Sequence, residues 1–331
     1  MTPVKIFSSI QKKTNYLLQN YIVDLLVTVG ILAGMKFFGH NPEAVLGHFA
    51  WALLPFAMIW GSMISSFLHN ASHENIGSKF SNRLAGEFCG AWVLYGFSNF
   101  VMIHHLHHRF SDEKHDPVHP GEMNFFVFLS APMRYMIVAT KGWLREMHGQ
   151  KKNYENIMNA QVVFFHLNLG LKLILWYKFF GPELFTFFYV PALLANYGIL
   201  AHINYVCHRD NADGSVEIVN LNHNAYYRFA NAVTFGGYFH KNHHVRLNVF
   251  NPAKLTGHRF EARYFTIKPQ HLNVEMLNMR HPEVSVLKNY FDLHVWGEAK
   301  KVKKYTAHNT ILITSPRDAR KNATPITSSM A

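Results

Sequence analysis

Residues 104–117 read HHLHHRFSDEKHDP, with four histidines among the first five positions. Two more histidine clusters lie elsewhere in the chain, HNASH at residues 69–73 and HKNHH at residues 240–244. In a helix the positions i, i+3 and i+4 share one face, so HxxHH presents three imidazoles to one point and HxxxH presents two. Because imidazole is a good ligand for iron, copper and zinc, the three clusters predict a metal site.

Histidine is common in this chain, with 23 among 331 residues, so chance matches must be weighed. At this frequency one HxxHH arises by accident in roughly one chain in ten, and two arise in about one in a hundred. The three clusters supply eight histidines, which are too many for one metal ion and suit two: His69, His73, His104, His107, His108, His240, His243 and His244. A ninth candidate is His208 in NYVCH, with Asn204 one turn earlier to hold a water molecule of the site.

Four apolar segments are candidates to cross a bilayer, at residues 21–38, 46–68, 162–180 and 184–203. Short turns join them in pairs, so we expect four transmembrane helices in two hairpins. Nearly all Lys and Arg residues lie in the termini and in residues 69–160 and 206–315, which the positive-inside tendency places in the cytoplasm. The sequence predicts an all-α integral membrane domain over residues 1–315, with a cytoplasmic helical cap and a disordered tail at 316–331.

Two further apolar stretches, residues 85–103 and 123–139, are interrupted by polar residues. We expect both to form helices that lie along the membrane surface. The alternative, in which residues 85–103 cross the bilayer, would place the flanking histidine clusters on opposite faces of the membrane. The net charge of +12 does not indicate nucleic-acid binding, because the basic residues alternate with long apolar runs. Cys89 and Cys207 form neither a disulfide framework nor a CxxC pair, so we expect the chemistry to lie in a reducing compartment or not to depend on thiols.

Other classes of metal or polar site fit the pattern less well. A soluble four-helix di-iron carboxylate protein would show paired ExxH motifs, which the sequence lacks. A transport site would place its polar groups within the spans rather than at their ends. The pattern therefore favours a histidine-rich dinuclear centre at the membrane surface.

With these motifs the chain resembles the membrane fatty acid desaturases and their hydroxylase relatives, over about residues 45–250. The resemblance rests on HxxxH, HxxHH and HxxHH in that order, with a pair of spans between the second and third. NAVTFGGYFHKNHH at residues 231–244 and the NxxxH of residues 204–208 are similar to the acyl-CoA delta-9 branch. The spacing of HNASH is instead similar to the acyl-lipid branch, which leaves the head group of the substrate open.

The resemblance implies that the nine histidines bind two Fe²⁺ ions, that Asn204 contributes through water, and that O2 is the co-substrate. It favours desaturation of a long acyl chain. A hydroxylase, ketolase or alkane mono-oxygenase on the same scaffold stays an alternative, as does a non-catalytic membrane protein that binds metal. The acyl group would be carried as an acyl-CoA, on an acyl-carrier protein or as an acyl-lipid.

Residues near the ligands supply further candidates. Metal-bound imidazoles usually donate their other N–H to a carboxylate or carbonyl, and six residues close in sequence are candidates to support the ligands: Glu74, Asp112, Asp116, Asp210, His202 and His223. His105 points away from the ligand face. Six aromatic residues near the boxes are candidates to line a substrate tunnel: Trp92, Phe97, Phe100, Trp143, Phe235 and Phe239.

The sequence carries no GxGxxG, no cysteine set for an iron–sulfur cluster and no HPGG of a fused cytochrome b5-type domain, since residues 119–122 read HPGE. We therefore expect electrons from a separate ferredoxin or cytochrome b5-type protein at the cytoplasmic face. The lack of a fused electron-transfer domain favours a bacterial inner membrane over the endoplasmic reticulum.

Overall fold

The computed structural model describes residues 3–42, 47–112, 116, 118, 120, 124–130, 141–210 and 216–255. The predicted tail at 316–331 and the part of the predicted cap beyond residue 255 lie outside these residues. The elements are α1 (Pro3–Lys12), α2 (Tyr16–Phe37), η1 (Gly47–Leu53), α3 (Leu54–Ser72), α4 (Lys79–Trp92), α5 (Phe97–Phe110), α6 (Phe125–Ser130), α8 (Tyr154–Leu184), the π-helical turn η2 (Phe185–Tyr189), α9 (Val190–Cys207), β1 (His208–Asp210), β2 (Val216–Ile218), α10 (Ala225–Val233), α11 (His240–Val245) and η3 (Pro252–Lys254). Residues 141–148 are also helical.

Three helical stretches in the described part of the chain are long and apolar enough to cross a membrane: Tyr16–Phe37, Phe49–Ser72 and Tyr154–Cys207. They indicate a membrane protein, as the sequence predicts. The first begins five residues before the expected start at residue 21. The third is a 54-residue stretch that contains both of the later predicted spans, 162–180 and 184–203.

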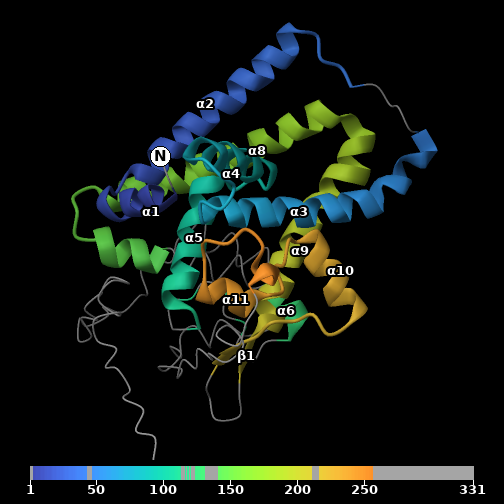
Figure 1. The fold of residues 1–331 in the computed structure, drawn as a ribbon. Helices are drawn as coiled ribbons and strands as arrows, with labels where there is room; N and C mark the ends of the chain where they lie inside the picture. The colour runs from blue at the N-terminus through green and yellow to red at the C-terminus, as the bar shows by residue number, and fades with distance from the viewer. Residues whose placement is uncertain are drawn as a thin grey trace, which may run out of the picture.

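This third stretch is sharply kinked where the sequence predicts a turn between two spans. Gly181 adopts φ 71° and ψ 170°, a conformation that costs glycine little and other residues much. Pro182 follows it and has no backbone N–H for the helical ladder. Figure 1 shows this bend: α8 runs across the upper part of the molecule, below the end of α2, and α9 descends from the bend.

The prediction of one surface helix over residues 85–103 is wrong in its bounds. α4 and α5 are separate helices of 14 residues each, and a turn between them contains Leu94 and Gly96 at φ 73° and 82°. A helix of 14 residues spans about 21 Å, short of the roughly 30 Å of a bilayer core. The alternative in which residues 85–103 cross as one helix therefore fails. Of the second predicted surface helix, at 123–139, α6 accounts for six residues, and residues 131–139 lie outside the described part.

The helices pack in pairs, α3 with α9 and α2 with α8. The short helix α1, which the sequence did not predict, packs against α5 and is fixed by a hydrogen bond from His148 Nε2 to the Ile10 carbonyl, 2.8 Å long. Figure 1 shows α5 and α9 both descending toward the end of the molecule where α11 and β1 lie. β1 pairs antiparallel with β2, with His208 opposite Ile218.

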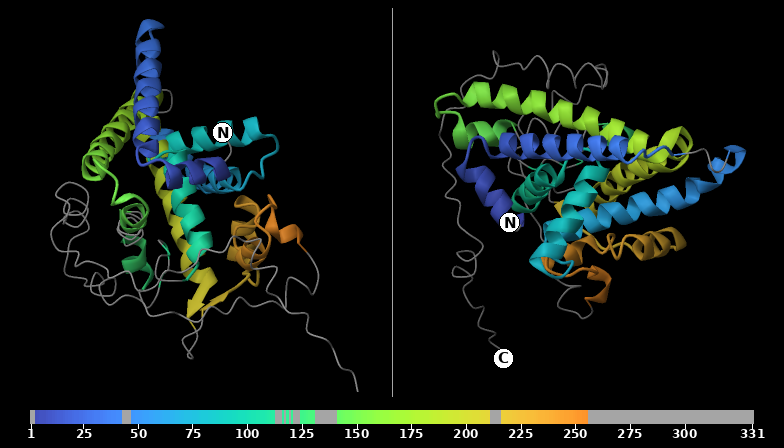
Figure 2. Two further views of the ribbon diagram at one scale, coloured as in Figure 1. Left: turned by 90° about the vertical axis from the view of Figure 1, so that its left-hand side faces the viewer. Right: turned by 90° about the horizontal axis from the view of Figure 1, so that it is seen from above.

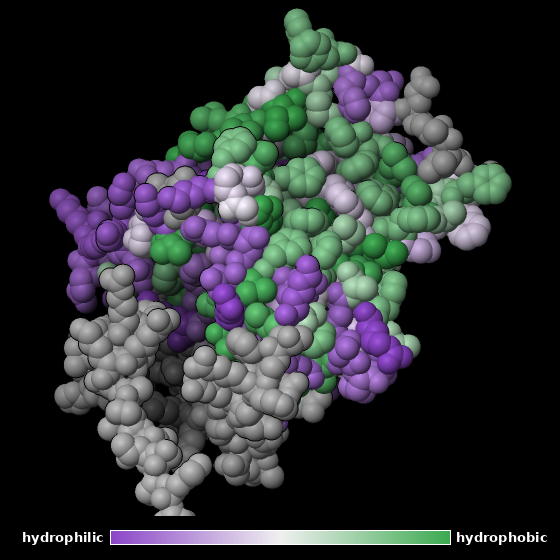
Figure 3. Space-filling view, viewed as in Figure 1, coloured by the Kyte–Doolittle hydropathy of each residue, from purple (hydrophilic) through white to green (hydrophobic). Residues whose placement is uncertain are grey.

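The molecular surface is divided by polarity. In Figure 3 hydrophobic residues cover the upper part, around α2 and α3, and hydrophilic residues gather along the left side and at the lower right. The exposed apolar side chains of α2 and of the stretch from η1 into α3 include Leu26, Phe37, Trp51 and Phe56. Such large exposed residues suit contact with lipid rather than water. The histidine-bearing ends of α5 and α9 lie away from this apolar region.

Candidate metal centre

Five elements present the histidines of the three boxes and His208. His69 lies in the last turn of α3, and His73 is its C-terminal cap. The second box lies in the last two turns of α5, and the third forms most of the six-residue helix α11. His208 is the C-terminal cap of α9 and the first residue of β1. Segments far apart in the sequence therefore contribute to one place in the fold.

The ring nitrogens of these nine histidines form two adjoining groups. The first consists of His69, His73, His104, His108 and His243, and the second of His107, His208, His240 and His244. Within each group the candidate ligand atoms lie within 4.8 Å of one another. The groups touch, since the ring centroids of His108 and His244 are 4.6 Å apart. The structure thus brings together the nine histidines that the sequence singled out as candidate ligands.

Each HxxHH box divides between the two groups, which corrects the expectation that it presents three imidazoles to one point. His104 and His108 enter the first group, whereas His107 enters the second. In α11 the pair His240 and His244 likewise separates from His243. At about 100° per residue, positions i+3 and i+4 lie on opposite sides of position i, so their side chains diverge. The spacing therefore suits a helix that lies between two metal ions.

The Nε2 atoms converge in both groups. His73 Nε2 lies 2.7 Å from His104 Nε2, and His69 Nε2 lies 3.0 Å from His243 Nε2. In the second group His208 Nε2 and His240 Nε2 are 3.0 Å apart. Imidazoles aimed at one another through the same atom are what a cation between them requires, because each neutral ring offers it one lone pair.

Two aspartates fix the opposite ring nitrogen of two histidines. His208 Nδ1 donates to Asp112 at 2.8 Å, and His107 Nδ1 donates to Asp116 at 2.9 Å. All four side chains are almost fully buried. A carboxylate that accepts from Nδ1 holds the tautomer in which Nε2 carries the lone pair, so both rings are oriented as ligands. The backbone N–H of Asp112 also donates to Asp116 Oδ2, at 2.8 Å, which ties the Asp116 carboxylate to the backbone of Asp112.

The remaining support candidates lie elsewhere. Among the described contacts Glu74 accepts no hydrogen bond from a box histidine, and the side chain of Asp210 lies outside the described residues. His202 Nδ1 forms a hydrogen bond with the hydroxyl of Tyr238, at 2.6 Å. His223 is exposed, and its ring lies 5.0 Å from that of Tyr227 in a tilted arrangement. His105 Nε2 donates to the Ser72 carbonyl, so this ring belongs to neither group.

The electrostatics of the site favour neutral imidazoles. Burial, reinforced by repulsion between neighbouring rings, holds the pKa of His104, His108 and His243 well below its ordinary value. The pKa values of His73, His240 and His244 shift in the same direction for the same reasons. A neutral imidazole is the form that ligates a metal ion, and a bound cation would offset the cost of burying so many rings. The donor set therefore fits two metal ions.

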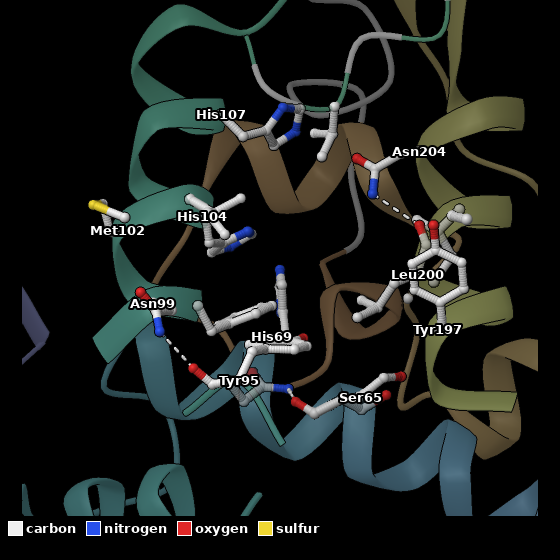
Figure 4. Close-up of a pocket in the computed structure, with 18 of the residues that line it drawn as sticks. Ser65, His69, Tyr95, Asn99, Met102, His104, His107, Tyr197, Leu200 and Asn204 are labelled. Carbon is white, nitrogen blue, oxygen red and sulfur yellow. Dashed lines mark hydrogen bonds between the residues drawn. The ribbon is translucent and has the colours of Figure 1, made fainter. Parts of the chain in front are cut away.

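Asn204 adds an observation that fits the same conclusion. Its Nδ2 donates to the Leu200 carbonyl at 2.8 Å, whereas its Oδ1 is buried and accepts no hydrogen bond from the described residues. Figure 4 shows Asn204 across the cavity from His107. A buried amide oxygen without a donor is costly, so this position suits a water molecule held between Asn204 and the metal site.

A largely apolar cavity of about 240 Å³ adjoins both groups, and His69, His104, His107, His240 and His243 form part of its wall. Figure 4 shows Ser65 and Tyr95 on the side of the cavity opposite His107 and Asn204. Of the six tunnel candidates, Phe100 and Phe235 line this cavity. Trp92 packs instead in the core against Trp176, and Trp143 stacks on Phe7.

The other two tunnel candidates, Phe97 and Phe239, are not among the described lining residues. Phe97 is fully buried against α4, where a side chain at Gly86 would overlap its ring. Sequence reasoning missed several lining residues, among them Tyr95, Asn99 and Lys141. No spacing rule marks them, because they come from turns and helices that only tertiary packing brings together.

The comparisons with known proteins agree with this site. Residues 46–249 match the family model described as fatty acid desaturase, so the chain belongs to that family. The match contains all three histidine boxes together with His208. Family membership indicates an oxidoreductase, and the histidine groups are compatible with a metal-dependent desaturase- or hydroxylase-type oxygenase. The searches of curated proteins and of solved structures returned no match.

Proposed function

We propose that this protein is an O2-dependent membrane fatty acyl desaturase that introduces a double bond into a long acyl chain through a histidine-ligated di-iron centre. The observation that carries the proposal is the position of two histidine groups on the wall of one apolar cavity. An acyl chain in this cavity would lie with a methylene beside the metal ions and away from water, which is the positioning that selective C–H oxidation requires.

The nine histidines are the proposed ligands, five for one ion and four for the other. When bound, two iron ions supply the capacity to reduce O2 and to remove hydrogen from an unactivated C–H bond. The protein's own residues do the rest. Asp112 and Asp116 orient His208 and His107 through Nδ1, and burial keeps the imidazoles neutral. Asn204 Oδ1 accepts from a water molecule at the edge of the site.

The membrane arrangement is part of the proposal. α2, the η1–α3 stretch, α8 and α9 cross the bilayer as four spans in two hairpins, with Gly181 at the second turn. The metal centre lies in a cap on the cytoplasmic side of a bacterial inner membrane. The substrate is an acyl-CoA, an acyl-carrier conjugate or an acyl-lipid, and a separate ferredoxin or cytochrome b5-type protein delivers the electrons.

Expression in a host with a defined lipid composition, followed by mass spectrometry of the fatty acids, tests the reaction. We expect an acyl product that is two hydrogen atoms lighter than its precursor. A product heavier by one oxygen atom would assign the protein as a hydroxylase on the same scaffold. A purified sample that contains iron but converts no acyl substrate, when supplied with O2 and a reductant, would indicate a metal-binding role without catalysis.

A further inference from the structure

Four exposed lysines lie together where two of the long apolar helices begin. One pair ends α1 and precedes α2, and the other pair lies in the turn before α8; these residues, the lysine cluster, are Lys12, Lys13, Lys151 and Lys152. The two pairs are neighbours in the fold, because Lys151 Nζ donates to the Lys12 carbonyl at 3.3 Å. None of the four belongs to the described lining of the cavity, so the cluster is separate from the metal site.

The helices α2 and α8 run parallel and in register, so both begin at the same level. Gln161 Nε2 of α8 donates to the Thr14 carbonyl just before α2, at 3.1 Å. Two turns further along, Asn168 Nδ2 donates to the Tyr21 carbonyl at 2.8 Å, and both pairs are 147 residues apart in the sequence. The right-hand view of Figure 2 shows the two helices side by side, with α1 where they begin. Because both belong to stretches long and apolar enough to cross a membrane, the lysine cluster lies at the level of the lipid head groups.

The segments that carry the lysine cluster have a large excess of positive charge. Residues 3–20 contain three Lys or Arg and no acidic residue, and residues 141–155 contain four against two, Glu146 and Glu155. Glu155 is already paired with Arg145, at 3.1 Å. Within the described part of the chain no carboxylate forms an ion pair with a lysine of the cluster. The surface at this place is therefore positive and attracts anions.

Exposed apolar side chains follow the lysine cluster along both helices. They include Val23 and Leu26 of α2, and Val163 and Leu167 of α8. In Figure 3 hydrophilic residues occupy the left side of the molecule, where Figure 1 places α1, and hydrophobic residues cover α2 beyond them. A ligand that fits both parts joins an anionic group to long apolar chains. This combination favours a phospholipid over a soluble acidic protein.

We propose that the lysine cluster binds the phosphate of an anionic phospholipid whose acyl chains lie along α2 and α8. The flexible stem of lysine suits this role, because it brings a compact positive charge to the level of the head groups. The lipid also joins α1 to the turn before α8. Since α1 packs against α5, where the Phe7 ring stacks on His105 at 5.4 Å, the bound lipid supports the helix that carries the second histidine box. The inference goes beyond the proposed function and does not depend on the reaction that the metal centre catalyses.

Native mass spectrometry of the full-length, iron-loaded protein in detergent tests this proposal. Two phospholipids with the same palmitoyl and oleoyl chains are titrated, the anionic phosphatidylglycerol and the zwitterionic phosphatidylcholine. We expect wild type to bind phosphatidylglycerol at least about tenfold more tightly, because lysines near an anionic lipid contribute about fivefold each. The cluster variant, which combines Lys13→Gln with Lys152→Gln, should bind phosphatidylglycerol about 25-fold more weakly than wild type does. Its affinity for phosphatidylcholine should be unchanged, which also shows that it is folded.

The matched control combines Lys36→Gln with Lys178→Gln. Both lysines are exposed and lie toward the other end of the same two helices, so the control removes the same charge from the opposite membrane surface. It should bind phosphatidylglycerol as wild type does. Thermal unfolding in detergent gives a second measurement: added phosphatidylglycerol should raise the unfolding temperature of wild type and the control, but not that of the cluster variant.

Three results would overturn the proposal: equal affinity of wild type for the two lipids, equal affinity of wild type and the cluster variant for phosphatidylglycerol, or equal losses in the cluster variant and the control. Loss of binding to an acidic ferredoxin in the cluster variant, with phosphatidylglycerol binding intact, would assign the lysines to the electron donor and also overturn it. Product analysis enters none of these outcomes. Failure of the desaturase assignment therefore leaves the lipid site standing, and failure of the lipid site leaves the desaturase assignment standing.

Discussion

Asp112 contacts the candidate ligand His208 at Nδ1, the ring nitrogen that points away from the metal site. Its carboxylate accepts from His208 Nδ1, and both side chains are almost fully buried. We expect Asp112→Asn to weaken iron binding by about 10- to 100-fold, because the amide holds the ligand tautomer less firmly and removes a negative charge. Competition with a chromogenic chelator measures this. Glu74→Gln is the control, and unchanged affinity in Asp112→Asn would contradict the assigned role.

His243 and His105 offer a matched pair of histidine substitutions. His243 Nε2 contacts His69 and His108 within the first group, whereas His105 donates to a backbone carbonyl. We expect His243→Ala to abolish desaturation and to lower the iron content of the purified protein. His105→Gln should retain both iron ions. Metal analysis and fatty acid analysis on the same preparations check this, and full activity in His243→Ala would rule out the ligand assignment.

For single residues, the sequence predicts which side chains belong to the site better than it predicts which of them contact one another. Spacing identified the eight box histidines that the structure gathers, because i, i+3 and i+4 positions are set by the helix itself, whereas His208 lies outside the boxes. The division of each HxxHH box between two groups could not be predicted, because it depends on how the boxes lie relative to each other in the folded chain. Asp112 and Asp116 were two of four carboxylates close in sequence, and only the folded turn shows that they reach His208 and His107 while Glu74 does not.

The pair α3 and α9 carries His69 and His73 on one helix and Asn204 at the end of the other, so its spacing sets part of the site. A Cβ atom at Gly61 of α3 would overlap the backbone oxygen of Ala192 in α9. Small residues permit such close approach between membrane helices. We expect Gly61→Ala to cost about 1–3 kcal/mol through overpacking and to reduce bound iron.

Thermal unfolding in detergent, followed by the loss of the monodisperse peak in size-exclusion chromatography, measures the cost of Gly61→Ala. Gly198→Ala in α9 is the control, since a Cβ atom there would meet nothing within 4 Å. If both variants unfold at the wild-type temperature, the close approach of α3 and α9 does not matter for stability.

Hydropathy predicted the long apolar helices but not where shorter helices begin and end. Residues 85–103 are apolar throughout most of their length, so hydropathy joins two helices that the turn at Leu94 and Gly96 separates. The chain reverses at this turn so sharply that the start of α5 lies against α4. A Cβ atom at Gly90 would overlap the backbone N of Phe97, so glycine is needed there. The sequence did not predict α1, because this helix has only a short apolar face. Its burial against α5 depends on the rest of the fold.

An ion pair links two of the apolar helices across the molecule. Lys172 of α8 is 1% exposed and donates to Asp24 of α2 and to the Leu94 carbonyl between α4 and α5. We expect Lys172→Met to destabilise the protein by about 3–5 kcal/mol, because Asp24 is left as an unpaired charge among apolar helices. Thermal unfolding checks this. The double variant with Asp24→Leu should recover most of the loss, and equal stability of Lys172→Met and wild type would exclude this role.

The placement of the whole molecule in the bilayer depends on α2 crossing it. Its 22 residues extend about 33 Å, slightly more than the hydrocarbon core of a membrane. Exposed positions bracket it, Lys13 before its start and Phe38 at its C-terminal cap. Because the two cysteines of the chain, Cys89 and Cys207, are both buried, single variants Lys13→Cys and Phe38→Cys each add one accessible thiol.

In intact cells a membrane-impermeant maleimide should label Phe38→Cys and leave Lys13→Cys unlabelled, and inverted vesicles should give the reverse. This pattern would place the N-terminal side of α2 in the cytoplasm, on the same side as α1, which packs against the histidine-bearing helix α5. Wild-type protein, with its buried thiols, should stay unlabelled in both preparations. Labelling of both variants from one side would mean that α2 does not cross, and it would remove the first of the proposed spans.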